Sequence, residues 1–166
     1  MVEVHLAAVR VDLQSNTPVV LLQEIEGSRR TLPIFIGAPE ATAIAFALQG
    51  VDTPRPMTHD LMRDLLEALG AKLERVVITE LRAATYYAEL QLLAGGRRTS
   101  VSSRPSDAIA LATRTGAPLF VAEDVLDAEG IELQAEELEE EPTNADELVG
   151  QFKEFLDNVR PEDFSS

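Results

Sequence analysis

Apolar residues occupy every second position at the start of the chain, a spacing typical of β-strands. They follow this spacing along residues 2–13, and His5 falls among the polar positions between them. More continuous apolar runs follow at 19–25 and 31–36, and each of them comes after a turn. The three segments predict an antiparallel meander of strands, in which His5 is a solvated histidine on the polar face.

The apolar spacing changes to that of helices at 40–49 and 58–69, where apolar residues recur three or four positions apart. Further segments then follow: strands at 72–81, 86–93, 97–101 and 119–122, and a third helix within 104–116. Runs of strands separated by helices favour an α+β fold. We expect a mixed, largely antiparallel sheet with three short helices packed on it, plus a C-terminal amphipathic helix.

The segment 104–116 has a defined start and a defined end. Pro105 is unsuited to a helix interior, Ser106 is expected to be the N-cap, and Asp107 places a negative charge in the first turn. Gly116 suits the left-handed conformation that ends many helices. Because alanine stands at every second position from 108 to 112, this helix should approach the sheet closely and be buried over most of its surface.

A similar corner occurs earlier, at 55–60. Arg55 and Pro56 precede the hydroxyl residue Thr58, which is again an expected N-cap, and Asp60 follows in the first turn of the helix. The two corners predict two similar combinations of an arginine and a carboxylate on one domain.

Three acidic residues are expected in the first turn of a helix: Glu40, Asp60 and Asp107. If these helix starts converge at one edge of the sheet, the carboxylates are candidate ligands of a divalent metal. Their oxygen atoms suit Mg²⁺ or Mn²⁺, and such ions commonly assist phosphodiester hydrolysis. Asp60 and Asp107 would then be catalytic residues.

The same corners contain groups that suit a phosphate and a proton transfer. Arg55 and Arg104 are candidates to hold a phosphate bidentately, and Ser106 is a candidate to assist them at the start of its helix. His59 is a candidate general acid or base, because the unperturbed pKa of histidine is near neutral. A structural explanation is equally open: first-turn acids favour helix starts by themselves, and the two arginines are suited to pair with Asp60 and Asp107.

Three segments carry a family resemblance: 32–41 (LPIFIGAPEA), 55–61 (RPMTHDL) and 104–112 (RPSDAIALA). In this order they resemble the bifunctional nuclease domain family, which occurs in bacteria and plants and is named for combined DNase and RNase activity. The resemblance runs from about residue 2 to residue 131. It implies a nuclease that acts on DNA and RNA with little sequence preference. The family usually has an aspartate two positions before the second Arg-Pro pair, where this chain has Ser102.

Composition places the chain among soluble proteins of one domain, spanning 1–133, followed by a tail. The 166 residues include no cysteine, which excludes a disulfide framework and a thiolate zinc site. The first residues lack the order of a signal peptide and no apolar run has membrane-spanning length, so a cytoplasmic location is expected. Residues 1–122 have a net charge of −1 and residues 123–166 one of −14, so the body lacks the basic excess of many nucleic-acid-binding proteins.

The tail divides into an acidic linker at 134–144 and an amphipathic helix at 145–160. The apolar stripe of that helix is expected to pack on its own domain, on a second subunit or on another protein. A homodimer or higher homo-oligomer is therefore expected. One alternative to the nuclease stays open, a non-catalytic binding or assembly protein that uses this helix. A third possibility is that the acidic tail occupies an arginine-lined groove as a mimic of nucleic acid and restrains activity.

Overall fold

The computed structural model describes residues 1–133 and Glu137; apart from Glu137, the expected linker (134–144) and C-terminal helix (145–160) lie outside the described residues. Eight strands form one sheet in the order β6-β5-β4-β7-β1-β2-β3-β8. The strands are β1 (Val2–Asp12), β2 (Thr17–Glu24), β3 (Arg30–Phe35), β4 (Ala71–Arg82), β5 (Thr85–Ala94), β6 (Arg97–Ser103), β7 (Leu119–Val121) and β8 (Ile131–Glu132). The helices are α1 (Ala38–Leu48), α2 (Thr58–Ala68), α3 (Pro105–Thr115) and α4 (Glu123–Glu129).

This arrangement confirms the α+β class and the largely antiparallel sheet. β7 pairs with β4 in parallel and with β1 in antiparallel orientation, and it thereby joins the β4–β5–β6 half of the sheet to the β1–β2–β3 meander. The structure adds a fourth short helix to the three that were expected, because α4 also packs against β3 and β4. A helix of seven residues spans barely two turns, which is too short to show a clear apolar period.

Both helix starts differ from the expected caps. The N-cap of α3 is Arg104, and Ser106 lies one residue inside the helix. The N-cap of α2 is Met57 rather than Thr58, and the Met57 N–H donates to Asp60 Oδ2 at 3.0 Å. At this second start, the first-turn aspartate thus accepts a hydrogen bond from the N–H of the N-cap residue, as the acidic residue of a capping box does.

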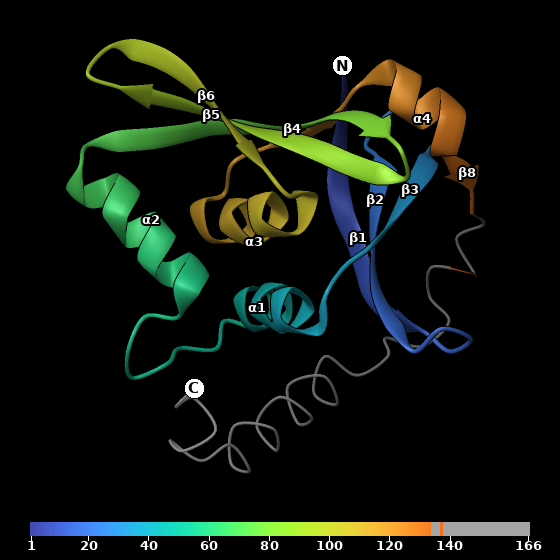
Figure 1. Cartoon of the computed structure of the whole chain (residues 1–166), viewed down its shortest axis with the longest axis horizontal. Helices are drawn as coiled ribbons and strands as arrows, with labels where there is room; N and C mark the ends of the chain where they lie inside the picture. Colours follow the sequence, from blue (N-terminus) through green and yellow to red (C-terminus); the bar gives the residue numbers. More distant parts are fainter. Residues whose placement is uncertain (134–136, 138–166) are drawn as a thin grey trace.

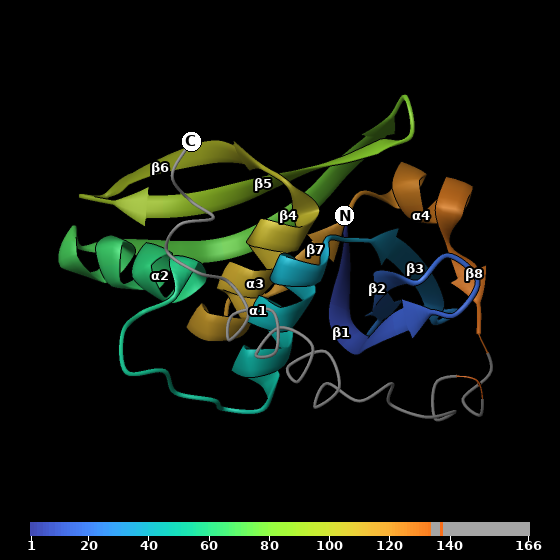
Figure 2. The ribbon, with the colours of Figure 1, turned by 60° about the horizontal axis from the view of Figure 1, so that its bottom comes forward.

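α2 and α3 cover one face of the β4–β5–β6 half of the sheet, and α1 packs against α3 and against β1 and β2 (Figure 1). The view in Figure 2 shows the same layering, with α4 at the other end of the molecule, beside β3. The starts of α1 and α3 lie on the same side, where the chain leaves β3 and β6 respectively. Residues far apart in the sequence are thus brought together at these two helix starts.

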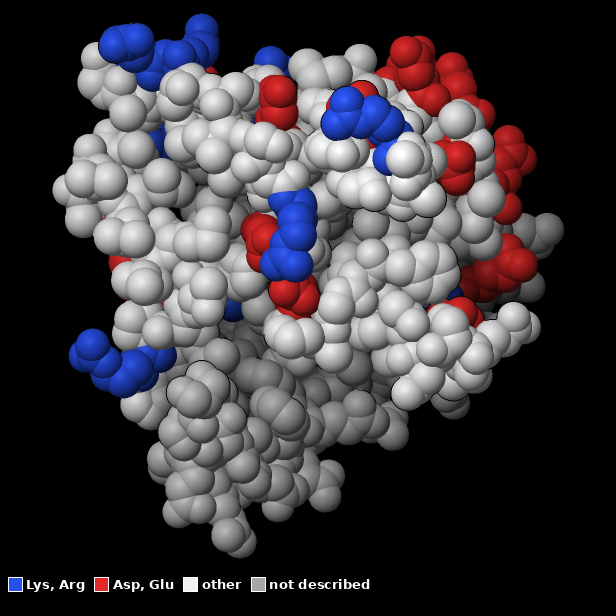
Figure 3. All heavy atoms as spheres, in the orientation of Figure 1, with Lys and Arg blue, Asp and Glu red and all other residues white. Residues whose placement is uncertain are grey.

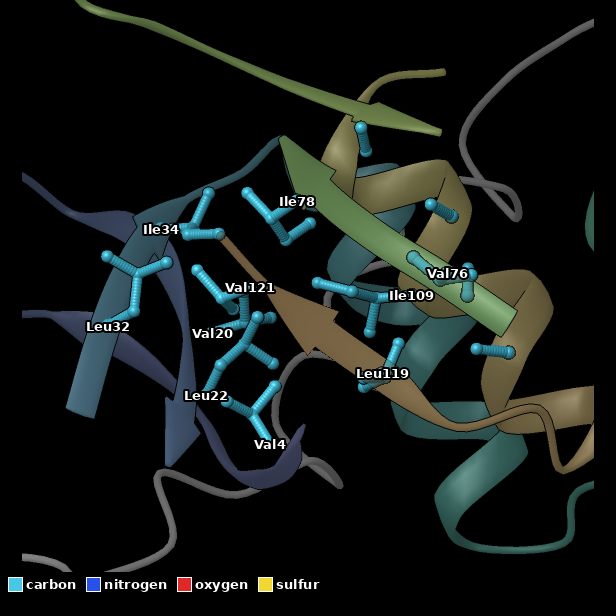
Figure 4. Packing of buried hydrophobic residues seen from close by; sticks show 14 of the residues in the cluster. Val4, Val20, Leu22, Leu32, Ile34, Val76, Ile78, Ile109, Leu119 and Val121 are labelled. Carbon is cyan, nitrogen blue, oxygen red and sulfur yellow. The ribbon is translucent and has the colours of Figure 1, made fainter. Parts of the chain in front are cut away.

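The core lies between the two halves of the sheet and α3. Figure 4 shows Ile109 of α3 among apolar side chains from β1, β2, β3, β4 and β7. Ala108, Ala110 and Ala112 are at most 3% exposed, so α3 lies against its neighbours without a large side chain at these positions. This confirms the prediction that the alanine-rich helix is buried over most of its surface.

Arg114, in the last turn of α3, holds the three helices together. Its Nε donates to Asp60 Oδ1 at 2.7 Å, and its Nη2 donates to the Ala43 carbonyl of α1 at 2.9 Å. Its Nη1 donates to the Ala110 carbonyl at 2.8 Å, within α3 itself. Only 5% of the Arg114 side chain is exposed, so this ion pair is shielded from solvent and from salt far better than a surface pair.

We predict that Ala108→Leu destabilises the protein by about 2 kcal/mol, although leucine is nearly as good a helix former as alanine. The reason is steric: Ala108 is fully buried, and a larger side chain pushes α3 away from the core. Denaturant unfolding measures the effect. Ala68→Leu, at an exposed position of α2, is the matched control and should change the stability by less than about 0.5 kcal/mol. Equal effects in the two variants would contradict close packing as the cause.

We predict that Arg114→Ala destabilises the protein by about 3 kcal/mol at pH 7, because it leaves the Asp60 carboxylate and two carbonyls without their donor. Burial opposes the charged form of Asp60, but the hydrogen bonds from Arg114 and Met57 outweigh it and lower the pKa of Asp60 below its ordinary value. The ion pair therefore stabilises the fold above about pH 4 and is lost as the pH falls through that lowered pKa.

The difference in unfolding free energy between wild type and Arg114→Ala should accordingly be largest near pH 7 and narrow below about pH 4. Denaturant unfolding at a series of pH values tests this. A difference that stays constant down to pH 3 would mean that Arg114 acts through packing alone.

Candidate functional site

Arg104 joins the starts of α1 and α3. Its Nη2 donates to Glu40 Oε1 at 2.9 Å and its Nε donates to Asp107 Oδ2 at 2.7 Å. Glu40 lies in the first turn of α1, and its carboxylate rests so close to Gly37 that a side chain at that position would overlap with it. The glycine before α1 thus makes room for the carboxylate that Arg104 binds.

His59, from the start of α2, shares Asp107 with Arg104. Its Nε2 lies 2.9 Å from Asp107 Oδ1, while Arg104 binds the other oxygen of the same carboxylate. The imidazole is almost fully buried, at 6% exposure, and its Nδ1 has no hydrogen bond to another described residue. Asp107 therefore fixes the orientation of the ring and leaves the second ring nitrogen available.

A pocket of about 200 Å³ opens at this cluster, which we call the His59 pocket. Polar and charged side chains from the starts of all three helices line it together with Arg114 and the apolar residues Phe46 and Met57. It is a concave site with a few convergent polar groups, the type of site in which ligands usually bind.

The interactions within the cluster favour the charged forms of Asp107 and Arg104. Burial raises the pKa of Asp107, but hydrogen bonds from Arg104 and then His59 outweigh burial, so the pKa lies below its ordinary value. Asp107 and Glu40 in turn raise the pKa of Arg104. The Arg104 side chain is nevertheless 66% exposed, and its two bonds use two of the five N–H groups of a guanidinium. The other three N–H groups are available to an incoming anion.

The structure brings four of the expected site residues together: Glu40, His59, Arg104 and Asp107. Asp60 is held apart by Arg114, and its side chain also borders a separate cavity of about 220 Å³ beside the 51–56 loop. The sequence predicted Arg55 or Arg104 as the partner of Asp60, and it did not predict Arg114. The one sign of a role for Arg114 was its position in the last turn of a helix, where the helix dipole stabilises a positive charge.

The remaining expected residues lie around the cluster. Arg55 is exposed in the loop before α2, and its carbonyl accepts a hydrogen bond from Thr53 Oγ1 at 2.6 Å. Its side chain makes no ion pair with any described residue. Ser106 is 7% exposed and lines a second cavity on the other side of Arg104, of about 350 Å³. Arg104 is thus a shared wall of the two cavities.

The carboxylates expected to hold a metal are already bonded to arginines. Arg104 binds Glu40 and Asp107, while Arg114 and a backbone N–H bind Asp60. In the part of the chain that the structure describes, no group of three histidine or acidic side chains is placed to hold an ion. In this arrangement, the three residues do not fit a divalent cation, because Arg104 binds Glu40 and Asp107 while Arg114 binds Asp60.

The surface charge agrees with the near-neutral body. On the face shown in Figure 3, basic side chains of the described residues lie apart from one another or beside acidic ones, without forming a continuous basic patch. Acidic side chains gather over α4. Any attraction of a polyanion to this face therefore depends on individual arginines. Among the described helices, none has the length and apolar character needed to cross a membrane.

Comparisons with known proteins agree with the resemblance of the three segments. The family model of the bifunctional nuclease domain matches residues 20–134. An uncharacterized protein of Mycobacterium tuberculosis (strain H37Rv) is 48% identical over 168 aligned residues, which cover 100% of this chain and 99% of that relative.

Plant relatives are similar over a shorter stretch. Bifunctional nuclease 1 of Oryza sativa subsp. japonica is 30% identical over 66% of this chain and 34% of its own length. Bifunctional nuclease 2 of Arabidopsis thaliana is 29% identical over 64% of this chain and 33% of its own length. The chain therefore spans about a third of the length of these plant proteins. The stretch that the family model matches includes Glu40, His59, Arg104 and Asp107. With more than half of its residues matched by that model, the chain belongs to the bifunctional nuclease domain family.

Proposed function

We propose that the protein hydrolyses phosphodiester bonds of DNA and RNA at the His59 pocket. The observation that carries this proposal is the shared carboxylate of Asp107, which holds a proton-transfer group, His59, next to an anion-binding group, Arg104. Phosphoryl transfer needs both: a cation that stabilises the charge of the transition state, and a base or acid that moves a proton. Membership in a nuclease family supports this reading of the pair.

Each residue has a defined role in the proposal. Arg104 binds two oxygens of the scissile phosphate through its free N–H groups. His59 accepts a proton at Nδ1 from the water that attacks phosphorus, while Asp107 stabilises the imidazolium through Nε2. The P–O bond to the leaving oxygen breaks, and that oxygen takes up a proton from the imidazolium or from solvent. Glu40 positions Arg104 from the side of α1. Asp60 holds the start of α2, and with it His59, through Arg114.

Metal dependence, with Mg²⁺ or Mn²⁺ on Glu40, Asp60 and Asp107, stays a prediction from the sequence. Such an ion, when bound, would act as a Lewis acid on the phosphate. The bonds of Arg104 and Arg114 to these carboxylates argue against it in the conformation described, and the roles above need no ion. Titration of the activity with Mg²⁺, Mn²⁺ and EDTA therefore separates the two versions of the proposal.

We predict that His59→Gln lowers the cleavage rate of single-stranded DNA and of RNA at least 100-fold, because general acid–base catalysis typically contributes 10²- to 10⁴-fold. Glutamine keeps a side-chain donor for Asp107 but has no titratable nitrogen. The matched control is His5→Gln, since the chain has only two histidines and His5 is exposed on β1. The control should cleave at the wild-type rate.

The proteins must be purified side by side, each with and without Mg²⁺, Mn²⁺ or EDTA. Equal cleavage by His59→Gln and wild type would place the activity elsewhere or in a contaminant. Activity lost in EDTA and restored by Mg²⁺ or Mn²⁺ would support the metal, whereas activity that persists in EDTA would support hydrolysis by Arg104 and His59 alone.

The alternative function is assembly with other copies of the chain, which the surface of α2 favours. Leu61, Leu65 and the C-cap residue Leu69 lie on one side of this helix and are 48%, 52% and 78% exposed. The other apolar face of α2, with Met62 and Leu66, packs against the core. A second exposed apolar face on one helix is a common sign of an interface, so we propose that the protein is a homo-oligomer that uses α2.

We predict that Leu65→Lys lowers the mass measured by light scattering toward that of a monomer of 18.1 kDa, because a buried lysine at an apolar interface is strongly unfavourable. The matched control is Leu48→Lys at the end of α1, since Leu48 is similarly exposed, at 57%. A wild-type mass of one chain, or the same mass for both variants, would exclude α2 as the interface.

A further inference from the structure

The cavity on the far side of Arg104 has the walls of a site for a nucleobase. We call it the Phe35 cavity, and its volume of about 350 Å³ is at the lower end of the range of ligand pockets, about 300–1,000 Å³. Phe35, at the end of β3, and Tyr86, near the start of β5, both line it. A space of this size is suited to one nucleoside and is far too small for a duplex.

The exposure of Phe35 is the first argument. Phe35 is 59% exposed, although most apolar residues of β2 and β3 are buried. A large aromatic side chain that borders a cavity while exposed to water gains free energy when a flat, apolar surface covers it. Bases are such surfaces, and proteins that bind single strands commonly stack them on exposed aromatic rings.

Tyr86 provides a firm second wall. Its side chain is half-buried and packs against the main core, so it is held in place from behind. Burial, and to a lesser extent the charge of Glu129, raise the pKa of Tyr86 above its ordinary value. The phenol is therefore neutral at pH 7, and its O–H is a hydrogen-bond donor that does not repel an anion.

The charge of the walls is the second argument. Although the chain has a net charge of −15, none of the described residues that line the Phe35 cavity is acidic, and the one charged group among them is Arg104. A nucleotide can thus enter with its phosphate toward the guanidinium and meet no carboxylate on the cavity wall. Aromatic surface next to an arginine is the combination that proteins use for single-stranded nucleic acids.

Ser106 completes the polar edge of the cavity. It is 93% buried, lines the cavity, and has no hydrogen bond from its hydroxyl to another described residue. Its backbone N–H lies in the first turn of α3, where N–H groups have no partner within the helix. A hydroxyl and a backbone N–H without described partners, beside an arginine, are suited to a phosphate oxygen.

The backbone at the other rim is held in an unusual conformation. The turn between β4 and β5 consists of Ala83 and Ala84, with φ of 48° and 60°, which alanine rarely adopts. Ala84 and the following Thr85 line the Phe35 cavity. The strained turn thus places small side chains at the opening, where asparagine or a larger residue would narrow it.

From these observations we propose that the Phe35 cavity binds the base of the nucleotide next to the phosphate held by Arg104, with the base stacked on Phe35. The proposal rests on the proposed function, because it takes the scissile phosphate to lie on the His59 side of Arg104. It names the preferred substrate class as single-stranded nucleic acid. A base in a duplex is stacked and paired, and it would have to be flipped out to enter.

The test compares two single-stranded DNA oligonucleotides of equal length and charge, one with all its bases and one with abasic sites at its central positions. The full chain carries His59→Gln so that neither oligonucleotide is cleaved during the measurement. Fluorescence anisotropy of labelled oligonucleotides gives the dissociation constants. We expect the oligonucleotide with bases to bind about tenfold more tightly, since stacking on one aromatic ring contributes about 1–3 kcal/mol per base.

Phe35→Ala should reduce this ratio to about one while the abasic oligonucleotide binds as before, because the phosphate contacts are untouched. Tyr87→Ala is the matched aromatic control: the Tyr87 ring lies under Arg82, 4.6 Å from its guanidinium carbon, and does not line the cavity. It should keep the tenfold ratio. Arg104→Gln should weaken both oligonucleotides similarly.

Phe35→Trp gives a direct signal of stacking, because the chain contains no tryptophan. The fluorescence of the introduced residue should be quenched by the oligonucleotide with bases and not by the abasic one. A ratio near one in the parent protein, a ratio that survives Phe35→Ala, or no quenching would each overturn the base site while leaving phosphate binding by Arg104 intact. If neither oligonucleotide binds and Arg104→Gln changes nothing, the proposed function itself fails, and the base site fails with it.

Discussion

The close packing of α3 is the constraint on which the rest of the structure depends. Alanine at positions 108, 110 and 112 lets this helix lie against β4 and β5 while it touches α1 and α2 on its flanks. A helix with larger side chains there would hold its neighbours farther apart, and the helix starts could not share hydrogen bonds of less than 3 Å. The site is therefore a consequence of how small these core residues are.

The arginines at the two ends of α3 both bind neighbouring helices, but they differ in how far they are buried. Arg114, 5% exposed, joins α3 to Asp60 of α2 and to the backbone of α1, and its donors are committed to the fold. Arg104, 66% exposed, joins α3 to Glu40 and still has donors that face solvent. The two guanidiniums have the same chemistry, and burial alone makes one a structural link and the other a binding group.

The distribution of charge gives little long-range attraction for a polyanion such as nucleic acid. The body is nearly neutral, and the face in Figure 3 has no continuous basic patch among its described residues, so long-range attraction of nucleic acid is weak. In the proposed function, the affinity for nucleic acid comes from short-range contacts at Arg104 and from stacking in the Phe35 cavity. These contacts depend less on salt than a basic patch does, and they favour flexible single strands over a stiff duplex.

The order of the elements from β1 to β7, the α+β class and the family could be predicted from the sequence, because apolar periodicity and short motifs depend only on neighbours along the chain. The short elements α4 and β8 were not predicted. The sequence also identified Glu40, His59, Arg104 and Asp107 as residues of interest. It could not determine that Arg104 binds Glu40, sixty-four positions away. Nor could it determine that Asp60, an expected metal ligand, is instead bound by Arg114. It also gave no sign of the Phe35 cavity, which forms between β3, β5 and α3. Partner choice among several arginines and carboxylates is decided by distance and burial, and only the packing of α3 sets both.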